Sequence, residues 1–430
     1  MNRERQFKSI TVVGLGYIGL PTAALFANSG HTVYGVDNNP DVVKTINSGE
    51  VHIDEVGLRT LVSAAVKSGK LSASVEPRVS EAFIVAVPTP ILQDKSPDLS
   101  FVQGAVERVM SVLKAGDLLI VESTVPPGTA EGIAAQIRER RPELVTPQGE
   151  LSVLVAHCPE RVLPGQILKE LVENDRVVGG LTGEATNAAA ALYSGIVSGE
   201  ILRTNATTAE MVKLAENTYR DVNIALANEI AVICEKLHIS VWDVIRFASR
   251  HPRVKYLSPG PGVGGHCIAV DPWFIVSQFP EESALIKSAR LRNDSMPGRV
   301  VETVLGFVAD IPAPKVACLG ASYKANVGDP RESPAIEVAH LLRERLPAGS
   351  KVAVNDMHIT APGHRLEQLA EVLEGADLVL LLTDHKEYRL LDPVEVAKVV
   401  RTKRLYDTRN HLSLDHWVEA GFVTKGLGRG

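Results

Sequence analysis

The chain has 430 residues, of which 45% are hydrophobic and 22% are charged, and its formal net charge is −6. This length exceeds the size at which a single hydrophobic core stops growing, so we expect two or three domains of an ordinary globular protein. A slightly acidic chain has no overall attraction to nucleic acid or to an anionic membrane. We therefore expect neither of these as a partner.

The cysteines do not predict a disulfide framework, because they are spread along the chain without paired spacing. They are Cys158, Cys234, Cys267 and Cys318. Two His-Cys dipeptides, at 157–158 and 266–267, resemble zinc ligands. Neither has a companion CxxC or HxxxH pair, so no metal site is expected.

An apolar, uncharged run at residues 9–27 follows several basic residues and resembles a signal peptide or a membrane span. It contains Gly14, Gly16 and Gly19 in fixed spacing and then Pro21, and it divides naturally into strand, turn and helix. We interpret it as folded core and expect a cytoplasmic protein.

The same region predicts a dinucleotide site. Residues 9–13 are a β-branched run typical of a buried parallel strand, and GLGYIG at 14–19 leads into a helix that ends near residue 28. A second strand at 32–36 ends in Asp37. A GxGxxG motif between strand and helix, followed by an acidic residue about 20 positions later, is typical of dinucleotide binding.

Each glycine of this motif has a physical task. Gly14 allows the tight turn, Gly16 lets the pyrophosphate approach, and Gly19 lets the helix pack on the strand, while the helix N-terminus faces the phosphates. Asp37 is expected to bind the ribose hydroxyls and to repel a 2′-phosphate, which favours NAD over NADP. The predicted cofactor contacts in this segment are Gly14, Gly16, Tyr17, Ile18, Gly19 and Asp37.

Further strands are predicted at 83–87, 118–121 and 151–156, each ending in a polar turn. Ligands of open α/β sheets bind beyond the carboxyl ends of the strands, so Thr89, Thr124 and Glu160 are expected to face cofactor or substrate. Taken singly, each of these residues is more typical of a helix cap or a turn than of a catalytic group.

A long helix is predicted from Thr207, with Glu210 as its capping-box partner, to about Leu237. Such a helix could join two domains and offer a surface to a second subunit. Lys213, Asn217 and Asp221 are spaced four apart and share one face, which is either solvated or functional.

Asparagine is a mediocre helix former, so its repeated use inside this helix calls for an explanation. We expect buried hydrogen bonding to explain Asn217, Asn223 and Asn228.

The segment Gly260-Pro261-Gly262-Val263-Gly264-Gly265-His266-Cys267 is rich in glycine and is followed by Asp271. Its glycines allow a close approach to a ligand, and a cysteine at the end of such a loop is placed for nucleophilic attack. A surface turn leading to a buried cysteine is the alternative.

A second α/β unit is predicted from a strand at 315–320, with Ser333 as a helix cap and later strands at 351–354, 377–382 and 404–406. It lacks GxGxxG and should bind something other than a dinucleotide. Lys324 and Arg331 could bind phosphates or could form surface ion pairs.

Seven motifs in this order resemble the UDP-glucose/GDP-mannose dehydrogenase family over nearly the whole chain. They are GLGYIGLPTA, VPTP, ESTVPPGT, CPERVLPG, AEMVKLAENTYRDVNIALANE, GPGVGGHCIAVDP and SYKANVGDPRESPA. The resemblance implies an α/β protein of two Rossmann-like doubly wound domains joined by a long central helix that also forms a homodimer. It implies an NAD-binding domain at 1–205, a central helical region with the cysteine loop at 206–300 and a UDP-sugar-binding domain at 301–430.

The activity implied by the resemblance is the NAD-dependent, four-electron oxidation of a sugar C6 alcohol to a carboxylate, in polysaccharide biosynthesis. Cys267 is implied as the nucleophile that holds the sugar as a thiohemiacetal and then a thioester. The other catalytic residues implied are Lys213, Asn217, Asp271, Thr124 and Glu160. Further cofactor contacts implied are Pro88, Thr89, Thr124 and Arg331.

The resemblance also implies a set of residues that bind the nucleotide sugar, with Arg253 reaching the substrate of a partner subunit. They are Glu160, Arg161, Val162, Lys213, Asn217, Arg220, His251, Arg253, Gly264, Tyr323 and Lys324.

Within the family, HPRV followed by PGPGVGGHCIAVDPWFIV is most similar to members that oxidise UDP-N-acetyl-D-mannosamine, whereas a YGGxC form is usual in UDP-glucose enzymes. UDP-N-acetylglucosamine and UDP-glucose remain alternative substrates. A single-step NAD-dependent hydroxyacid or sugar-acid dehydrogenase is a rival that would not need Cys267. A non-catalytic nucleotide-binding protein is a rival of another class.

Overall fold

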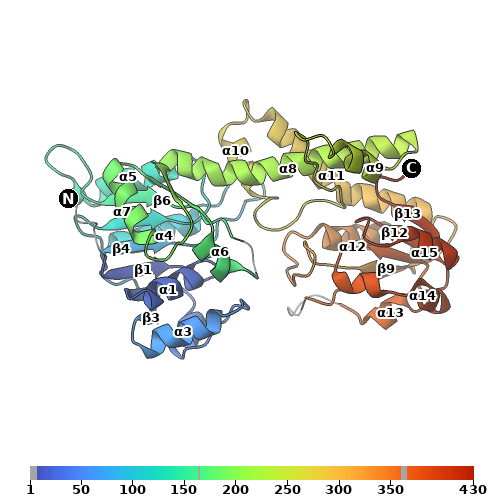
Figure 1. Ribbon diagram of the computed structural model, residues 1–430, viewed down its shortest axis with the longest axis horizontal. Helices are drawn as coiled ribbons and strands as arrows, with labels where there is room; N and C mark the ends of the chain where they lie inside the picture. Colours follow the sequence, from blue (N-terminus) through green and yellow to red (C-terminus); the bar gives the residue numbers. More distant parts are fainter. Residues whose placement is uncertain (1–6, 163–164, 360–365) are drawn as a thin grey trace. The chain divides into compact units, whose positions relative to one another are not determined.

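The computed structural model describes residues 7–162, 165–359 and 366–430 (Figure 1). The chain divides into two compact units, residues 1–216 and 217–430. Leu163 and Pro164 of the CPERVLPG motif lie outside the described residues.

The first unit is built on a sheet whose strand order, among its described residues, is β3-β2-β1-β4-β5-β6-β7-β8. Neighbouring strands are parallel except for β6 and β7, which are antiparallel. The strands are β1 (Ser9–Val13), β2 (Thr32–Val36), β3 (Leu71–Ser74), β4 (Ala82–Val85), β5 (Leu118–Val121), β6 (Leu154–His157), β7 (Arg176–Gly180) and β8 (Ile201–Asn205). The order reverses direction between β1 and β4, which is where open α/β sheets bind their ligands.

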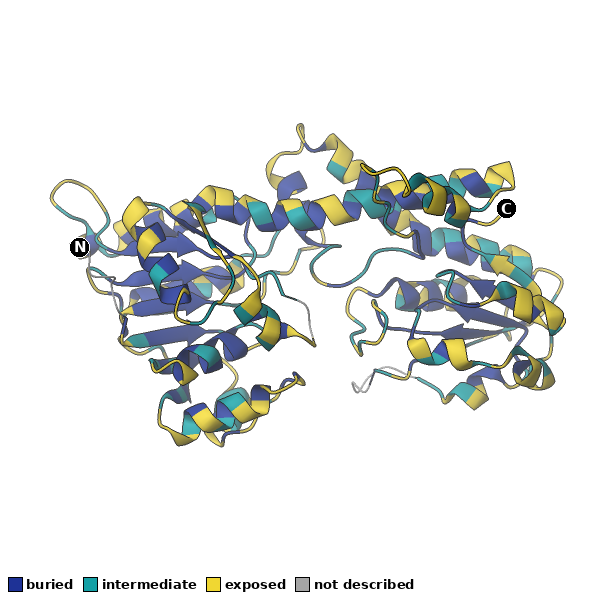
Figure 2. Cartoon of the chain, in the orientation of Figure 1, coloured by how far each residue is buried: buried dark blue, intermediate teal, exposed yellow. Residues whose placement is uncertain are grey.

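Helices cover both faces of this sheet, and the strands are buried between them (Figure 2). One core contains side chains of α1, α3 and α7, and a second core on the other face contains side chains of α4 and α5. The helices are α1 (Gly19–Asn28), α2 (Pro40–Asn47), α3 (Leu58–Lys67), α4 (Ser100–Met110), α5 (Thr129–Arg140), the 3-10 turn η1 (Pro142–Leu144), α6 (Ile167–Glu173) and α7 (Gly183–Tyr193).

Helix α8 (Ala206–Leu237) runs without a break across the division between the two units. The capping box predicted at its start is wrong. Asn205, two residues before the predicted cap Thr207, caps the helix instead, because its side chain accepts from the Thr208 amide at 2.8 Å. The Glu210 carboxylate is buried and accepts instead from the amides of Gly128 and Ala130 at the start of α5. Glu210 therefore caps a neighbouring helix and not its own.

The second unit has a parallel sheet of order β10-β9-β11-β12-β13 among its described residues. Its strands are β9 (Lys315–Leu319), β10 (Lys351–Asn355), β11 (Leu378–Leu381), β12 (Arg404–Asp407) and β13 (Val423–Gly426). Its further helices are α9 (Val241–Ala248), α10 (Asp271–Gln278), α11 (Ala284–Phe307), α12 (Pro334–Arg345), α13 (Leu369–Leu373), the 3-10 turn η2 (Lys386–Leu390), α14 (Pro393–Val399) and α15 (Leu414–Glu419). Ser333 caps α12 as predicted, because its side chain accepts from the Ala335 amide.

The predicted strands all exist, but β4 begins one residue before its predicted range and β6 ends one residue after its own. Four further strands among the described residues were not predicted. These are β3, β7, β8 and β13. β3, β8 and β13 are polar and only partly buried, so their hydrophobic signal is weak. None of the described helices is both long and apolar enough to cross a membrane.

Candidate active site

The loop after β1 has the geometry that a dinucleotide needs. Gly14 has φ +91°, and a Cβ there would lie 2.4 Å from the Ala86 carbonyl oxygen. A Cβ at Gly19 would lie 1.8 Å from the Gly14 oxygen, because α1 starts directly against the turn. Nothing lies within 4 Å of a Cβ at Gly16, so a phosphate can approach its backbone. The residues present therefore fit NAD.

Asp37 closes this loop from the end of β2. One carboxylate oxygen accepts from the Leu15 amide at 3.0 Å, and the other accepts from the Asn39 amide at 2.9 Å. Asp37 is half-buried, while Gly16 and Tyr17 are exposed and Ile18 is half-buried at the start of α1. The carboxylate keeps lone pairs for ribose hydroxyls, since each oxygen can accept more than one hydrogen bond.

Three strand ends of the first unit meet at the same edge, because β4, β5 and β6 are neighbours and parallel. Pro88 and Thr89 follow β4, Thr124 follows β5 and Glu160 follows β6. Thr89, Thr124 and Glu160 are half-buried, and Pro88 is exposed. Sheet topology therefore brings the predicted strand-end residues to one edge.

Lys213 and Glu160 form an ion pair at this edge. The Lys213 ammonium lies 4.0 Å from the Glu160 carboxylate, and their side chains are only 9% and 14% exposed. Beside them the Arg161 guanidinium pairs with Glu216 at 2.6 Å. The Val162 amide donates to Glu160. The polar face of α8 is therefore not solvated here.

A buried network that was not predicted lies at the end of β5. Glu122 pairs with Arg176 at 3.3 Å and accepts from the Tyr193 hydroxyl at 2.6 Å. Burial raises the pKa of Glu122, although Arg176 opposes the shift. Glu122 directly follows a predicted strand, and this position is the signal that could have identified it.

In the second unit, Asn217 donates to the Asp271 carboxylate at 2.5 Å, and both side chains are buried. Asp271 is the first residue of α10, and its amide donates to the Cys267 carbonyl at 2.8 Å. Cys267 is half-buried. A cysteine one turn before a buried amide–carboxylate pair suits nucleophilic chemistry.

A second buried network holds the start of the glycine loop against α8. The Asn228 side chain donates to Asn293 at 2.9 Å and accepts from the Gly260 amide at 2.9 Å. Asn293 also donates to Asp221 at 2.8 Å, and Arg290 pairs with Asp221. The expected buried hydrogen bonding is confirmed for Asn217 and Asn228.

Asn223 differs from the other two asparagines. It is only half-buried, and its amide donates to the Tyr219 carbonyl of its own helix at 2.7 Å. The prediction of buried bonding is therefore wrong at this position, because the residue lies at the edge of the packed face.

The glycine loop packs tightly on the loop that follows β9. A Cβ at Gly264 would lie 2.3 Å from the Glu332 oxygen, and one at Gly265 would lie 2.7 Å from the Tyr323 ring. Burial raises the pKa of Tyr323, and the neighbouring Asp329 and Cys267 raise it further. Only glycine fits at these contacts, and they bring Tyr323 close to Cys267.

The remaining predicted substrate and phosphate residues of the second unit lie at the surface. They are Arg220, His251, Arg253, Lys324 and Arg331. Arg331 pairs with Asp329 at 2.6 Å and belongs to the same loop as Lys324.

The sequence analysis did not single out Arg409, which lies against the glycine loop. A Cβ at Gly260 would lie 2.5 Å from its guanidinium, which pairs with Asp384 at 2.9 Å. The signal was available, since Asp384 follows β11 and Arg409 follows β12 at the edge where such sheets bind ligands.

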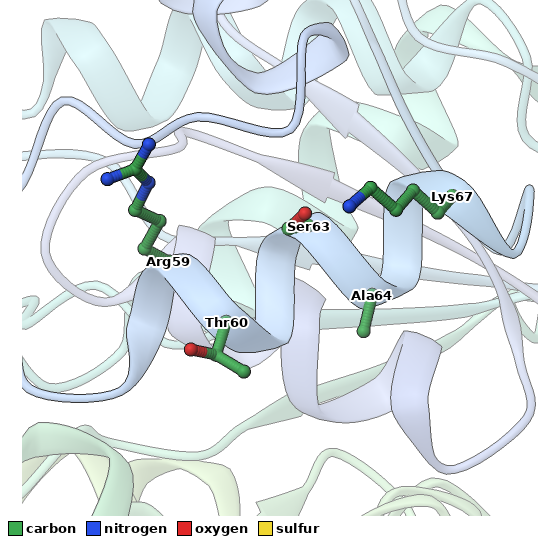
Figure 3. A pocket seen from close by; sticks show the side chains of 5 residues that line it. All are labelled: Arg59, Thr60, Ser63, Ala64 and Lys67. Atoms are coloured by element: carbon green, nitrogen blue, oxygen red, sulfur yellow. The ribbon is translucent and has the colours of Figure 1, made fainter.

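A shallow hollow elsewhere in the first unit lies along one helix, α3. Its lining is Arg59, Thr60, Ser63, Ala64 and Lys67 (Figure 3). These residues come from no strand end, so the hollow is separate from the candidate site. Over the described part of the chain, no three His, Cys, Asp or Glu side chains gather as a metal site would require.

The GxGxxG turn at residues 14–19, Asp37 and the polar strand ends define the first unit as the dinucleotide-binding part of an NAD-dependent dehydrogenase. Models of the UDP-glucose/GDP-mannose dehydrogenase family match the chain in three parts. They are the NAD binding domain at residues 8–197, the central domain at 207–295 and the UDP binding domain at 317–414. The chain belongs to this family. It is an NAD-dependent nucleotide-sugar dehydrogenase with two Rossmann-like domains joined by a central helical region.

Named relatives cover almost the whole chain. An NDP-N-acetyl-D-galactosaminuronic acid dehydrogenase of Ralstonia nicotianae is 49% identical over 414 residues, which are 94% of this chain and 97% of the relative. A UDP-N-acetyl-D-mannosamine dehydrogenase of Escherichia coli is 46% identical over 417 residues, which are 93% and 99% of the two chains. The solved UDP-N-acetyl-D-mannosamine dehydrogenase of Pyrococcus horikoshii is 40% identical with a TM-score of 0.90, covering 98% of this chain and 99% of that one.

Proposed function

We propose that this protein oxidises the C6 alcohol of UDP-N-acetyl-D-mannosamine to the carboxylate, through a covalent intermediate on Cys267. The observation that carries the proposal is the arrangement at the start of α10. The half-buried Cys267 lies one turn before Asp271, whose carboxylate is held by Asn217 at 2.5 Å. An oxidation that stopped at the aldehyde would have no use for this nucleophile.

In the first oxidation, a base removes the proton of the C6 hydroxyl, and a water or Lys213 assisted by Asp271 takes this role. NAD, when bound, accepts one hydride in each of the two oxidations. The Cys267 thiolate adds to the aldehyde carbon to give a thiohemiacetal, and loss of the second hydride gives a thioester. Water then cleaves the C–S bond, releasing the carboxylate and the thiolate. Thr124, Glu160 and Asp271 are the candidates to activate that water.

Lys213 and Asn217 stabilise the oxyanions that form on the sugar carbon. They are one turn apart on α8, so their side chains project from the same face. Each well-placed donor to a developing oxyanion contributes about 3 kcal/mol to the transition state. Both residues are buried and held by acidic partners, Lys213 by Glu160 and Asn217 by Asp271.

The same two units supply the binding residues. The residues that bind NAD are Gly14, Gly16, Tyr17, Ile18, Gly19, Asp37, Pro88, Thr89, Thr124 and Arg331. The residues that bind the nucleotide sugar are Arg220, His251, Arg253, Gly264, Tyr323, Lys324 and the 160–162 segment. We assign NAD binding to residues 1–205, the cysteine loop and subunit contact to 206–300, and UDP-sugar binding to 301–430.

The UDP-N-acetyl-D-mannosamine assignment is supported by the names of the Escherichia coli and Pyrococcus horikoshii proteins. A second candidate is the N-acetylgalactosamine sugar nucleotide, which the name of the 49% identical Ralstonia protein favours. UDP-N-acetylglucosamine and UDP-glucose remain further candidates.

The test is a panel of these four sugar nucleotides with NAD, counting the NADH formed for each sugar consumed. Two NADH per UDP-N-acetyl-D-mannosamine, with a higher kcat/KM than for the other three sugars, are expected. One NADH per sugar would contradict the four-electron oxidation. In Cys267→Ala the carboxylate product should disappear, and Cys267→Ser is the matched variant of nearly equal size. Unaltered acid formation in both variants would exclude the covalent intermediate.

We also propose a homodimer that forms through α8. In the second unit its exposed apolar residues Tyr219, Leu226, Ile233 and Leu237 follow a spacing of seven, seven and four, which places them on one face. Leu226→Asp is expected to shift the mass measured by light scattering from dimer to monomer. An unchanged mass would place the subunit contact elsewhere.

We further propose a cytoplasmic location and a role in polysaccharide biosynthesis. All four cysteines are free thiols in the structure, which suits a reducing compartment. A uronate made on a nucleotide carrier is an activated building block for glycosyl transfer.

A further inference from the structure

Two side chains at the carboxyl edge of the second sheet form a hydrogen-bonded pair without access to solvent. Asp356 follows β10 and His385 follows β11. The His385 Nε2 lies 3.0 Å from the Asp356 Oδ2, and both side chains are 0% exposed. We call this pair the Asp356–His385 clamp.

Asp356 is saturated with donors from two segments, the loop that follows β9 and the turn that follows β10. Its Oδ2 accepts from the amides of Ala321 and Ser322 at 2.7 and 2.8 Å and from the Ser322 hydroxyl at 2.9 Å. Its Oδ1 accepts from the amides of His358 and Ile359 at 2.9 and 3.1 Å. Both oxygens of this carboxylate are therefore occupied by donors of the protein itself.

His385 binds the other end of the same loop. Its Nδ1 accepts from the Asn326 amide at 2.8 Å. A backbone N–H can only donate, so Nδ1 carries no proton and the Nε2–H must donate to Asp356. The hydrogen bonds thus fix one neutral tautomer of His385. The Asn326 side chain in turn accepts from the Lys386 amide at 3.0 Å.

A third contact lies between these two ends. The Thr383 hydroxyl donates to the Ser322 carbonyl at 2.8 Å. The loop is thus fixed at Ala321 and Ser322 on one side and at Asn326 on the other, with Tyr323 and Lys324 between them. Tyr323 is the residue that packs on the glycine loop at Gly264 and Gly265.

We propose that Asp356 and His385 are positioning residues, which hold the 321–326 loop in the shape that presents Tyr323 and Lys324 to the nucleotide of the substrate. This rests on the proposed function, in which Tyr323 and Lys324 bind the nucleotide sugar. Neither clamp residue touches the substrate, since both are enclosed by protein. The clamp acts through the backbone of the loop and therefore governs nucleotide affinity more than the chemical steps.

Two variants of His385 separate its two hydrogen bonds. His385→Asn keeps an acceptor at the position of Nδ1 and loses the donor to Asp356. His385→Gln keeps a donor at the position of Nε2 and leaves the Asn326 amide without an acceptor. Because an unpaired buried amide is costly, we expect His385→Gln to raise the Kd for UDP and the KM for the UDP-sugar about tenfold. The kcat and the Kd for NAD should stay within about twofold.

His385→Asn is expected to recover most of the UDP affinity, since it still holds Asn326. Thr383→Val, which removes only the hydroxyl, should raise the Kd for UDP severalfold and serves if the His385 variants do not fold. Calorimetric titration of the whole chain with UDP, and separately with NAD, measures these values. Wild-type UDP affinity in both His385→Gln and Thr383→Val, or equal loss of UDP and NAD binding, would overturn the proposal.

Lys324→Ala distinguishes this failure from failure of the proposed function. If Lys324→Ala weakens UDP binding while His385→Gln does not, the loop binds UDP but the clamp does not position it. If Lys324→Ala and Tyr323→Ala both leave UDP binding unchanged, the nucleotide site itself lies elsewhere and both proposals fall.

Discussion

The first strand-to-helix connection has the same two features in each unit, a glycine and a neighbouring aspartate, but the two aspartates have different partners. A glycine with positive φ directly follows both β1 and β9, +91° at Gly14 and +94° at Gly320, and the strand beside each is followed by an aspartate, Asp37 or Asp356. Asp37 is half-buried and accepts from two backbone amides. Asp356 is enclosed and accepts from the start of the loop after β9, from the turn after β10 and from His385. An aspartate directly after this neighbouring strand can therefore either remain open to a ligand, as Asp37 does, or bond within the protein, as Asp356 does.

Loop length explains the difference. In the first unit α1 begins at Gly19, so the turn is short and its amides stay open to a phosphate. In the second unit α12 does not begin until Pro334, so a long irregular segment needs partners for its backbone amides. Asp356 accepts from two of these amides, those of Ala321 and Ser322, and His385 accepts from the Asn326 amide.

The largest effect is expected from a methyl group in the short loop. Gly19→Ala would place a Cβ 1.8 Å from the Gly14 oxygen, so it should lower the free energy of unfolding by about 3 kcal/mol and abolish NAD binding. Gly16→Ala is the control, because its Cβ enters open space. It should weaken NAD binding with stability unchanged within about 0.5 kcal/mol. Equal stability of the two variants in urea would refute the packing argument.

Substituting the two aspartates compares the units directly. Asp356→Asn turns an NH2 group toward donors on either side, and we expect a loss of about 3 kcal/mol from the second unit. Asp37→Asn can keep one acceptor and should cost less than about 1 kcal/mol. Urea unfolding followed by a fluorescent probe in each unit measures both. A larger loss for Asp37→Asn would reverse the roles assigned here.

As the pH falls, Asp356 in the second unit should become protonated only below the pH at which an ordinary aspartate does. Burial opposes ionisation of Asp356, but His385 and the backbone amides outweigh it and hold its pKa below the usual range. Its contribution to stability is therefore fully present above about pH 4 and is lost as the pH falls below that value. Stability of Asp356→Asn should fall less steeply below pH 4 than that of the wild-type chain.

A buried histidine should make the first unit lose stability at a higher pH than Asp356 does for the second unit. Burial lowers the pKa of His157, at the end of β6, to about 3. Below about pH 6.5 the unfolded chain gains a proton that the folded unit cannot bind, so the unfolding free energy falls by about 1.4 kcal/mol per pH unit down to about pH 3. His157→Leu should flatten this slope in urea unfolding between pH 6.5 and 4. An unchanged slope would assign it to other groups.

The smallest effect concerns cofactor choice. Asp37→Ser removes the charge that repels a 2′-phosphate, so the ratio of kcat/KM for NADP to that for NAD should rise about tenfold, which corresponds to about 1.4 kcal/mol. Thr383→Val, in the other unit, should leave this ratio unchanged. A ratio that does not move in Asp37→Ser would mean that the ribose is recognised by other residues.

The sequence by itself determined the two α/β units, the dinucleotide loop and the long helix. Its signals are local: the spacing of Gly14, Gly16 and Gly19, the β-branched strands and the Ser333–Pro334 helix start all depend on near neighbours in the chain. The family motifs likewise lie within short segments. A single segment is therefore enough to predict its own helix, strand, turn or motif.

Only the tertiary structure decided which distant groups meet. Glu210 looked like the cap of its own helix, yet burial against α5 directs it to Gly128 and Ala130. Asn223 looked like Asn217 and Asn228, yet it lies at the edge of the packed face. Asp356 and His385 are ordinary polar residues in the sequence. They become a solvent-free pair because β10 and β11 flank β9 and bring their carboxyl ends to one edge. Such pairings depend on long-range packing, which no short segment specifies.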